Sequence, residues 1–317
     1  MRTRTLITGG AGFIGSHLAA RCVAAGDDVH IITRLTTSLH RLTPLEGSIT
    51  VHRASLDDAA AFAKAIDAAR PQRVFHLAAE TRPPAGRTAD QAAATAIAEV
   101  RNLLLFLQLL DGMEEKPDCF VRAGTIAEYG PVPPPYIEHG PTHPATPYGR
   151  AMAACTDALQ RLAPLLGFPV ASARLALVYG PHQSESFMIP AMIRDCLRNR
   201  PFAVKRPLDR RDLIHVDDAV DALLLMAEKP LSTARAINIG TGVAPAMHEV
   251  ARMIIEMTDA DPAVVGFSGE QASTDVSNLC CSTVLAQDLL GWTARIPLAE
   301  GLKRTVAWAR AQNLQEA

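Results

Sequence analysis

Residues 4–18 read R-T-L-I-T-G-G-A-G-F-I-G-S-H-L, and this stretch decides the fold. Its apolar start, T-L-I-T, suits a buried parallel strand, and residues 16–25 can continue as a helix. Between these segments, Gly9, Gly12 and Gly15 follow the spacing G-x-x-G-x-x-G. Glycines there permit a tight turn, let a pyrophosphate approach backbone N–H groups, and let helix and strand pack closely. The stretch therefore predicts a dinucleotide site at a helix N-terminus, although an ordinary strand–turn–helix can also carry three glycines.

The composition indicates a soluble globular protein. Of the 317 residues 48% are apolar, and the net charge of −2 is near balance. Because no basic patch stands out, we expect no nucleic-acid partner, and no run approaches the ~18 apolar residues of a membrane helix. The chain enters its first strand directly, without the regions of a signal peptide. The six cysteines form no C-x-x-C pair. We therefore expect a cytoplasmic protein with reduced thiols and no metal site.

Strand-like and helix-like segments alternate after the glycine stretch. The predicted strands are residues 28–33, 49–53, 73–79, 118–123, 170–178 and 235–239. The predicted helices are residues 57–69, 88–112, 148–166, 188–200, 246–258, 283–290 and 298–312, with a turn entering a helix at 210–227. This alternation implies a parallel sheet with right-handed crossovers.

Two segments deviate from the alternating pattern. The helix at 88–112 is apolar over much of its surface, so it is either deeply buried or part of a subunit contact. We expect a homodimer that uses this helix. Residues 131–147 form a proline-dense loop without helix or strand period, and such a loop beyond a strand's carboxyl end commonly carries function.

The end of the strand at 28–33 indicates the type of cofactor. In a dinucleotide fold, the residue closing this strand faces the adenine ribose, roughly 20 residues beyond the glycines. An acidic residue there would repel a 2′-phosphate, but this chain has Thr33 and then Arg34. Because a guanidinium pairs well with phosphate, NADP(H) is favoured and NAD(H) is possible. Arg34 could instead be a solvated loop residue, and Arg41 is a second, less well placed candidate.

Further short motifs follow the glycine stretch in a fixed order. They are H-L-A-A (76–79), Thr125, P-Y-G (147–149), V-Y-G-P (178–181), R-D-L-I-H-V-D-D (211–218), I-N-I-G-T-G (237–242) and L-G-W (290–292). With these motifs the chain resembles the extended short-chain dehydrogenase/reductase family, in its nucleotide-sugar epimerase, dehydratase and reductase branch. The resemblance extends over nearly the whole chain.

The resemblance implies a fold and a division into domains. The implied fold is α/β, a Rossmann doubly wound parallel sheet of about seven strands with a smaller C-terminal substrate lobe. The implied NAD(P)-binding domain is residues 1–178 and 211–240. The smaller substrate-binding lobe is then residues 179–210 and 241–317, and its substrate would be a nucleotide sugar.

The resemblance also implies the site residues. Those near the cofactor are Gly9, Gly12, Phe13, Ile14 and Gly15 at the pyrophosphate, Thr33 and Arg34 at the ribose, Ser55 and Leu56 near adenine, and Leu77, Ala78, Ala79, Tyr148 and Leu175 along the dinucleotide. Those near the substrate are Thr81, Thr125 and Arg211.

Tyr148 and Thr125 match the family's catalytic pair. A tyrosine hydroxyl gives or takes the proton at a sugar oxygen while nicotinamide exchanges hydride with the carbon. The threonine hydroxyl hydrogen-bonds the same oxygen as charge develops there. Taken singly, Tyr148 could be a helix-capping aromatic and Thr125 a turn residue. Arg211 is the candidate for a substrate phosphate, although it could equally pair with Asp212 or Asp217.

Some positions depart from the family pattern. The family's tyrosine motif is Tyr-x-x-x-Lys, but Met152 occupies the place of the lysine, and Arg150 points to a different side of the helix. Ala96 replaces an active-site asparagine that is frequent in the family. The sequence Thr125-Ile126-Ala127 lacks both carboxylates of the Thr-Asp-Glu found in sugar 4,6-dehydratases. Dehydration is therefore disfavoured.

These observations support one leading hypothesis and two alternatives. The leading hypothesis is an NADPH-dependent ketoreductase of a nucleotide-linked keto-sugar, which rests on Arg34, Thr125 and Tyr148. The first alternative is an NAD(P)-dependent nucleotide-sugar epimerase or dehydratase. The second is a dinucleotide-binding protein with impaired catalysis, which Met152 and Ala96 motivate.

Overall fold

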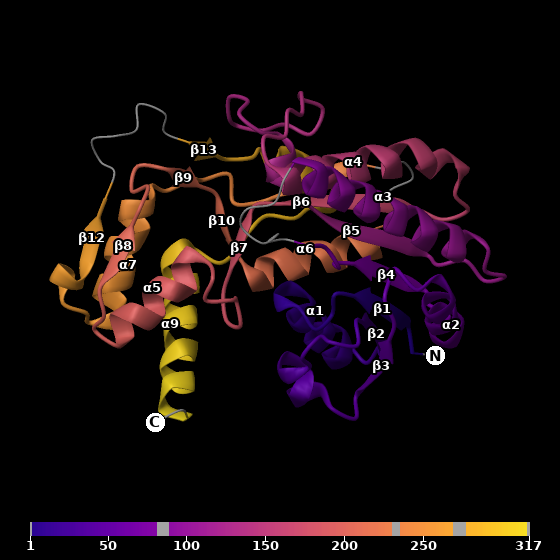
Figure 1. The fold of residues 1–317 in the computed structure, drawn as a ribbon, viewed down its shortest axis with the longest axis horizontal. Helices are drawn as coiled ribbons and strands as arrows, with labels where there is room; N and C mark the ends of the chain where they lie inside the picture. Colours follow the sequence, from indigo (N-terminus) through magenta and orange to yellow (C-terminus); the bar gives the residue numbers. More distant parts are fainter. Residues whose placement is uncertain (1, 81–88, 230–234, 269–276, 316–317) are drawn as a thin grey trace. The chain divides into compact units, whose positions relative to one another are not determined.

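The computed structural model describes residues 2–80, 89–229, 235–268 and 277–315 (Figure 1). Its internal contacts divide the chain into two units. Unit 1 consists of Met1–Val132, Glu138–Leu175 and Val220–Asn238. Unit 2 consists of Pro133–Ile137, Ala176–Ala219 and Ile239–Ala317. The role of unit 2 in substrate binding stays a prediction.

A seven-stranded sheet forms the centre of unit 1, in the order β11-β6-β5-β4-β1-β2-β3 (Figure 1). Its strands are β1 (Arg4–Thr8), β2 (Asp28–Thr33), β3 (Ile49–Arg53), β4 (Arg73–His76), β5 (Cys119–Thr125), β6 (Val170–Leu175) and β11 (Arg235–Ile239). From β3 to β6 all neighbouring strands pair in parallel. The predicted α/β fold with a doubly wound sheet is confirmed. Because the strand order reverses between β1 and β4, the carboxyl ends of these two strands form the switch point where such sheets bind ligands.

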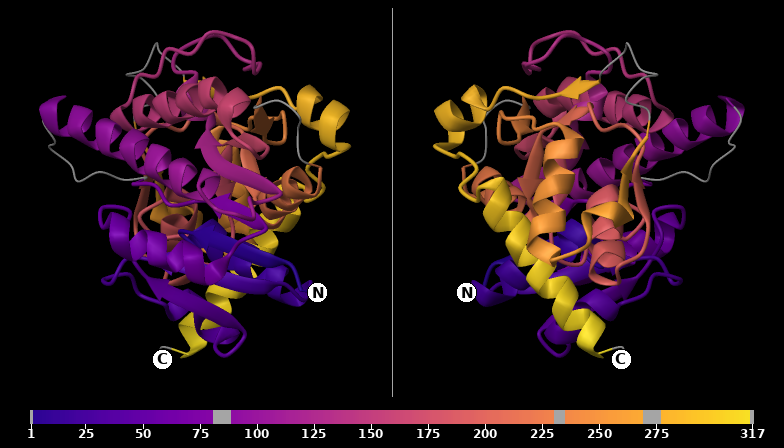
Figure 2. Two further views of the ribbon diagram at one scale, coloured as in Figure 1. Left: turned by 90° about the vertical axis from the view of Figure 1, so that its right-hand side faces the viewer. Right: turned by 90° about the vertical axis from the view of Figure 1, so that its left-hand side faces the viewer.

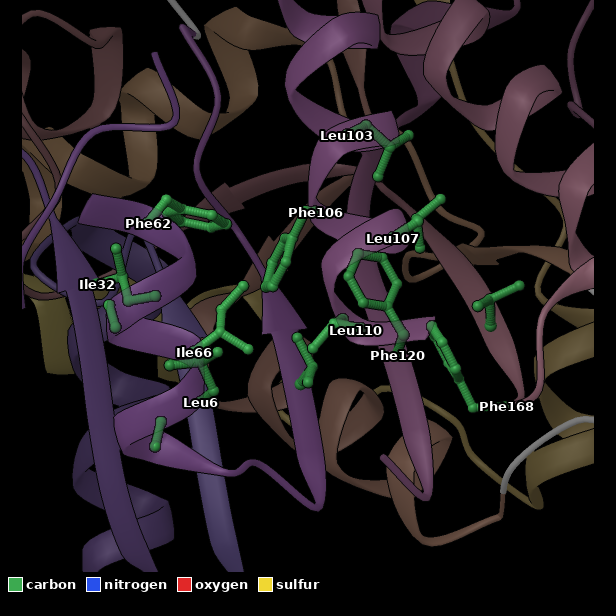
Figure 3. Close-up of a cluster of buried hydrophobic side chains, with 14 of the residues drawn as sticks. Leu6, Ile32, Phe62, Ile66, Leu103, Phe106, Leu107, Leu110, Phe120 and Phe168 are labelled. Atoms are coloured by element: carbon green, nitrogen blue, oxygen red, sulfur yellow. The ribbon is translucent and has the colours of Figure 1, made fainter. Parts of the chain in front are cut away.

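The helices of unit 1 flank the sheet. They are α1 (Phe13–Ala24), α2 (Ala59–Ala69), α3 (Ala89–Asp111), α4 (Pro147–Leu162) and α6 (Val216–Glu228). Side chains from α2, α3 and α4 join residues of the central strands in one buried apolar cluster. Figure 3 shows Phe106 of α3 between Phe62 of α2 and Phe120 of β5, with ring centroids 5.0 Å and 5.4 Å apart. This cluster fixes α2, α3 and α4 against the sheet.

Helix α3 is only partly covered. Leu103, Phe106, Leu107 and Leu110 are fully buried, yet only 22% of the segment Ala93–Asp111 is buried overall. This segment is long and apolar enough to cross a membrane by length and composition alone, which is weak evidence for a single helix. The expectation that no run reaches membrane length therefore has this one exception among the described helices.

Unit 2 has its own core. Its helices are α5 (Met188–Leu197), α7 (Met247–Thr258), α8 (Val284–Leu290) and α9 (Leu298–Gln315). Its strands form three parallel pairs: β7 (Leu177–Tyr179) with β10 (Leu213–His215), β8 (Phe202–Val204) with β12 (Val265–Phe267), and β9 (Arg210–Arg211) with β13 (Asn278–Leu279). Helices α5, α7 and α9 share one buried apolar cluster. Figure 2 shows α9 running beside α7 in unit 2.

The strand predicted at 170–178 is wrong, because the structure has two strands there. β6 ends at Leu175, and β7 begins at Leu177 and pairs with β10. At the break the Ala176 N–H donates to the Ile239 carbonyl at 2.8 Å, and the Leu177 N–H donates to the Asp212 carbonyl at 3.0 Å. The chain thus changes hydrogen-bonding partners at Ala176. The apolar residues 175–178 span the break, so the sequence carries no mark of such a change.

Candidate active site

The glycine turn forms a closely packed cradle between β1 and α1. Gly9 has a φ of +72°, which disfavours any residue with a side chain, and a Cβ on Gly9 would lie 2.8 Å from the Ala78 nitrogen. A Cβ on Gly15 would overlap the Gly9 carbonyl oxygen. Gly12 is the N-cap of α1, and no side chain caps that helix. The first N–H groups of α1 are therefore left to an external acceptor, so the turn fits a pyrophosphate.

The carboxyl end of β4 lies against the same turn. The Leu77 N–H donates to the Thr8 carbonyl at 3.1 Å, and the Ala78 N–H donates to the Thr8 hydroxyl at 3.4 Å. The sequence places a strand through Ala79, but β4 ends at His76. Leu77, Ala78 and Ala79 are partly exposed beyond the strand, at the switch point where a dinucleotide would lie.

The end of β2 holds the two residues proposed to select the cofactor. Thr33 is buried, and its carbonyl accepts from the Ala54 N–H at 3.0 Å. Arg34 is exposed at the start of the following turn. Its backbone is held by Arg53, whose guanidinium donates to the Arg34 carbonyl at 3.0 Å and to the Thr37 carbonyl at 2.8 Å. Arg53 was not singled out in the sequence, although it ends the neighbouring strand β3.

The other residues predicted near the cofactor occupy different environments. Ser55 lies in the turn before α2, where its hydroxyl accepts from the Asp57 N–H at 3.2 Å. Leu56 packs partly against the apolar cluster of unit 1. Leu175 is buried at the end of β6, in register with Thr125. Phe13 and Ile14 are half-buried in the first turn of α1. Their contact with a cofactor stays a prediction.

Tyr148 and Thr125 meet at the carboxyl end of β5. Thr125 closes that strand, and Tyr148 is the second residue of α4. The Thr125 side chain lies near enough to the Tyr148 phenol to lower its pKa. Thr146 caps α4 by accepting from the Gly149 N–H at 3.0 Å, and Pro147 occupies its first turn. The sequence pattern around Tyr148 is therefore that of a well-capped helix start.

Gly149 explains how Tyr148 comes so near to Thr125. A Cβ on Gly149 would lie 2.6 Å from the Ala127 carbonyl oxygen. Only a glycine lets the first turn of α4 approach the 3₁₀ turn Ile126–Glu128 that follows Thr125. The motif P-Y-G thus sets the distance between the two hydroxyl-bearing side chains.

The groups around Tyr148 change its pKa in opposite directions. Burial raises the pKa of the Tyr148 phenol to about 12. The Arg122 guanidinium and the Thr125 side chain lower it, whereas Glu128 and Glu99 raise it. A phenol that exchanges its proton near neutral pH needs the lowering contributions.

The comparisons with known proteins identify the family of the chain. A family model described as the NAD dependent epimerase/dehydratase family matches residues 5–240. The chain belongs to this family. The predicted resemblance to the extended short-chain dehydrogenase/reductase family is therefore confirmed, and the protein is an enzyme of that type.

Named relatives include both epimerases and dehydratases. The UDP-glucose 4-epimerase of Mycolicibacterium smegmatis is 28% identical over 97% of this chain and 98% of its own length. The dTDP-D-glucose 4,6-dehydratase of Mus musculus is 26% identical over 97% of this chain and 88% of its own length. Among solved structures, MoeE5 in complex with UDP-glucose and NAD is 29% identical, with a TM-score of 0.80 and coverage of 98% of this chain and 99% of its own.

A buried ion pair behind the family's threonine was missed by sequence reasoning. Glu128 is fully buried, and one of its carboxylate oxygens accepts from the Thr125 N–H at 3.1 Å. The other accepts from Arg174 at 2.8 Å, and Arg174 also donates to the Tyr129 hydroxyl at 2.9 Å. Tyr129 in turn donates to Asn238 at 2.7 Å. Glu128 therefore holds the Thr125 backbone in place rather than standing free as an acid.

Arg122 is a second residue that the sequence did not single out. It lies on β5 and is buried, and it donates to the Met152 sulfur at 3.0 Å. Met152 itself is 1% exposed on α4. The place of the family's lysine is thus filled by a thioether with a guanidinium beside it. An arginine inside a strand carries no spacing signal that would link it to Tyr148.

Arg211, predicted at a substrate phosphate, is already paired within unit 2. It forms an ion pair with Asp209 at 2.7 Å and donates to the Ser277 carbonyl at 2.9 Å. The suggested pairing with Asp212 or Asp217 is wrong. Asp212 is fully buried and accepts from the N–H and the hydroxyl of Thr241 at 2.8 Å and 2.7 Å, so its carboxylate is occupied.

Two further predictions concern the substrate and metals. Thr81, predicted near the substrate, lies outside the described residues. Ala96 lines a groove beside α3 rather than contributing a polar group. Within the described ranges no cluster of three or more His, Cys, Asp or Glu side chains could hold a metal ion.

Proposed function

We propose that the protein reversibly oxidises one hydroxyl of a nucleotide-linked sugar and returns the hydride to the opposite face, as a nucleotide-sugar 4-epimerase does. The proximity of the Tyr148 and Thr125 side chains at the end of β5 is the observation that carries this proposal. Both residues lie in unit 1 with the glycine cradle. The similarity to a UDP-glucose 4-epimerase over nearly the full length of both chains supports the substrate class.

The two side chains divide the work at the sugar oxygen. Tyr148, as phenolate, takes the hydroxyl proton when the carbon is oxidised, and as phenol it returns the proton on reduction. The Thr125 hydroxyl hydrogen-bonds the same oxygen and stabilises the charge that develops there. A nicotinamide dinucleotide held by Gly9, Gly12 and Gly15 would supply the hydride acceptor. No further co-reactant is needed for epimerisation, since oxidation and reduction balance.

Dehydration is less well supported. Removal of water from a sugar needs an acid for the leaving hydroxyl and a base for the adjacent carbon. The dehydratase carboxylates are replaced by Ile126 and Ala127. The nearest acidic residue in that loop, Glu128, is paired with Arg174 at 2.8 Å.

A second candidate is the NADPH-dependent reduction of a keto-sugar. The observation that favours it is the end of β2, where Thr33 and Arg34 replace a carboxylate. Arg53, which holds the Arg34 backbone, adds a second cation at the same turn. Two guanidinium groups there suit a 2′-phosphate. The family name and MoeE5 point to NAD, so NADP preference is a proposal that rests on these two arginines.

The subunit arrangement is also a proposal. Ile97 and Leu104 of α3 are 68% and 39% exposed, and they line an apolar groove of about 780 Å³ with Leu56, Val100 and Leu105. Four large side chains of α3 are buried in the core of unit 1. Among the described residues, the helix therefore exposes one apolar face and does not have apolar surroundings on all sides. We expect the same face of a second copy to cover it, as in an isologous dimer. Ile97→Glu should reduce the mass seen by light scattering from twice 33.9 kDa to that value; a native protein that is already monomeric would refute the dimer.

Identification of the copurifying cofactor and an epimerisation assay test the proposal together. The denatured protein's supernatant is analysed by mass spectrometry for NAD and NADP. The protein is then incubated with UDP-glucose and NAD⁺, and the 4-epimer is followed by proton NMR. Appearance of the epimer without net change at 340 nm supports the epimerase. Stoichiometric loss of NADPH absorbance with a nucleotide-linked 4-keto-sugar, without epimerisation, favours the ketoreductase instead. The Tyr148→Phe variant is the control in each assay.

A further inference from the structure

Arg122 is a buried cation that forms no ion pair with any carboxylate of the described residues. It is 2% exposed, and its guanidinium donates to the Met152 sulfur at 3.0 Å, to the Thr156 hydroxyl at 3.2 Å and to the Ser172 hydroxyl at 3.4 Å. These three partners are uncharged. In the described part of the chain, no carboxylate lies within 4.0 Å of Arg122 to form an ion pair.

The arrangement differs from that of the other buried arginine at the site. Arg174 is paired with Glu128 at 2.8 Å, as buried charges usually are. A guanidinium remains charged in a protein interior, so burying one without a carboxylate disfavours the folded state. Two hydroxyls and a thioether compensate for little of that penalty. Arg122 therefore calls for a role other than stabilisation of the fold.

The contact with Met152 places this charge under the catalytic end of α4. Met152 follows Tyr148 by one helical turn, so the two side chains lie on the same side of the helix. Arg122 also belongs to the strand that ends at Thr125. Arg150, the nearest arginine in sequence to Tyr148, is exposed and donates to the Pro144 carbonyl at 3.2 Å instead.

We propose that Arg122 supplies from β5 the positive charge that α4 lacks at Met152, and that this charge stabilises ionised Tyr148 during proton transfer. The proposal rests on the acid–base role proposed for Tyr148. Arg122 is a positioning residue, because its charge acts on the sugar only through the Tyr148 phenol.

The charges that face Tyr148 come from three elements. Arg122 of β5 lowers the pKa of Tyr148, and it is the largest influence after burial. Glu128 raises that pKa, but its own charge is compensated by Arg174. Glu99 of α3 also raises it, and burial raises the pKa of Glu99 itself, so that its carboxyl is more easily neutral than an exposed one. Arg122 is thus the main group that makes ionisation of the Tyr148 phenol easier.

Two neighbours of Arg122 respond to the same charge. Burial and Arg122 together lower the pKa of His76 on β4 to about 3, so His76 adds no positive charge near neutral pH. Burial raises the pKa of Cys155, and Arg122 opposes that effect without reversing it. Both side chains are therefore neutral at physiological pH. Of these three residues, only Arg122 is positively charged.

The experiment is a titration of Tyr148 by ¹³C NMR in protein labelled at the tyrosine ζ-carbon. The chain has four tyrosines, and Tyr148→Phe identifies the signal. NAD⁺ is present in all samples, because its positively charged nicotinamide ring should bring the ionisation to a lower pH. Arg122→Gln keeps a hydrogen-bonding side chain but loses the charge. It should shift the ionisation of Tyr148 upward by about 1 pH unit or more.

Two further variants separate charge from packing. Thr156→Val removes one hydrogen-bond partner of Arg122 but keeps its charge, and it should shift the titration by less than about 0.3 unit. The exchange variant Arg122→Met/Met152→Lys moves the cation from the strand to the helix. It should restore most of the shift and raise turnover above that of Arg122→Gln.

The outcomes distinguish this proposal from the proposed function. An unchanged titration in folded Arg122→Gln, or an equal shift in Thr156→Val, refutes the role of Arg122. If Arg122→Gln does not fold, the exchange variant decides, and a Tyr148 titration more than about 1 unit above the native one refutes the proposal. A missing shift of the Tyr148 titration in Arg122→Gln would count against the role of Arg122 and not against the proposed reaction. An inactive native protein whose Tyr148 still responds to Arg122 would refute the proposed reaction and leave the electrostatic link standing.

Discussion

The two ends of the candidate site differ in how they are encoded. The glycine cradle is built from Gly9, Gly12 and Gly15, which lie within one turn of chain and need only backbone geometry. The corner around Tyr148 is assembled from β5, α3, α4 and β6, and its charges come from residues far apart in sequence. Local motifs can therefore predict a dinucleotide site, whereas the proposed proton chemistry depends on contacts that only the fold brings together.

The largest expected effect is at the corner. Tyr148→Phe removes the group proposed to exchange the proton and should lower turnover by about 10²–10⁴-fold. The glycine cradle is untouched, so the affinity for NAD⁺, measured by calorimetry, should fall far less than turnover does. A variant that binds NAD⁺ and keeps native turnover would show that another residue moves the proton.

The next largest effect is expected at the Glu128–Arg174 ion pair, which supports the turn after Thr125. Arg174→Met leaves the fully buried Glu128 carboxylate without its partner, which typically costs about 3–5 kcal/mol of unfolding free energy. Urea denaturation followed by circular dichroism measures this loss. The double variant Arg174→Met/Glu128→Gln removes both charges and should recover part of it. If the single variant is as stable as the native protein, the ion pair does not hold the Thr125 turn.

The cradle offers the contrasting test. Gly15→Ala places a methyl group against the Gly9 carbonyl, so the turn must shift by the amount that the overlap demands. The expected cost is about 1–3 kcal/mol of stability, together with a fall of more than tenfold, or ~1.4 kcal/mol, in affinity for NAD⁺. Gly26→Ala is a control for glycine replacement, because a Cβ there meets no atom within 4 Å, although its φ of +86° adds strain. It should lose stability but not affinity. Equal loss of affinity in both variants would argue against a specific cradle.

The sequence predicted the fold because its signals are local. The seven strands of the sheet and the helices between them follow from apolar runs and glycine punctuation, and P-Y-G with Thr125 predicted the pair of side chains proposed to be catalytic. It failed at Ala176, where a continuous apolar run hides a change of hydrogen-bonding partner. It also missed Arg122, Arg174 and Glu128. Each of these is one charged residue in an otherwise apolar or turn segment, and its meaning appears only when a residue from another element faces it.

The smallest effect is expected at Arg34, which follows the end of β2. Arg34 is exposed and its backbone is fixed by Arg53. We therefore expect its side chain to reach a 2′-phosphate without reorganisation of the turn. One charge-assisted contact is worth about 1.5–3 kcal/mol. Arg34→Ala should therefore lower the ratio of NADPH to NADH affinity by about tenfold or more, and leave the affinity for NADH nearly constant. Arg41→Ala is the matched control, since Arg41 is the weaker candidate for the same phosphate. A ratio that falls in Arg41→Ala but not in Arg34→Ala would move the phosphate site to Arg41, and an unchanged ratio in both would mean that the cradle binds NAD without regard to this turn.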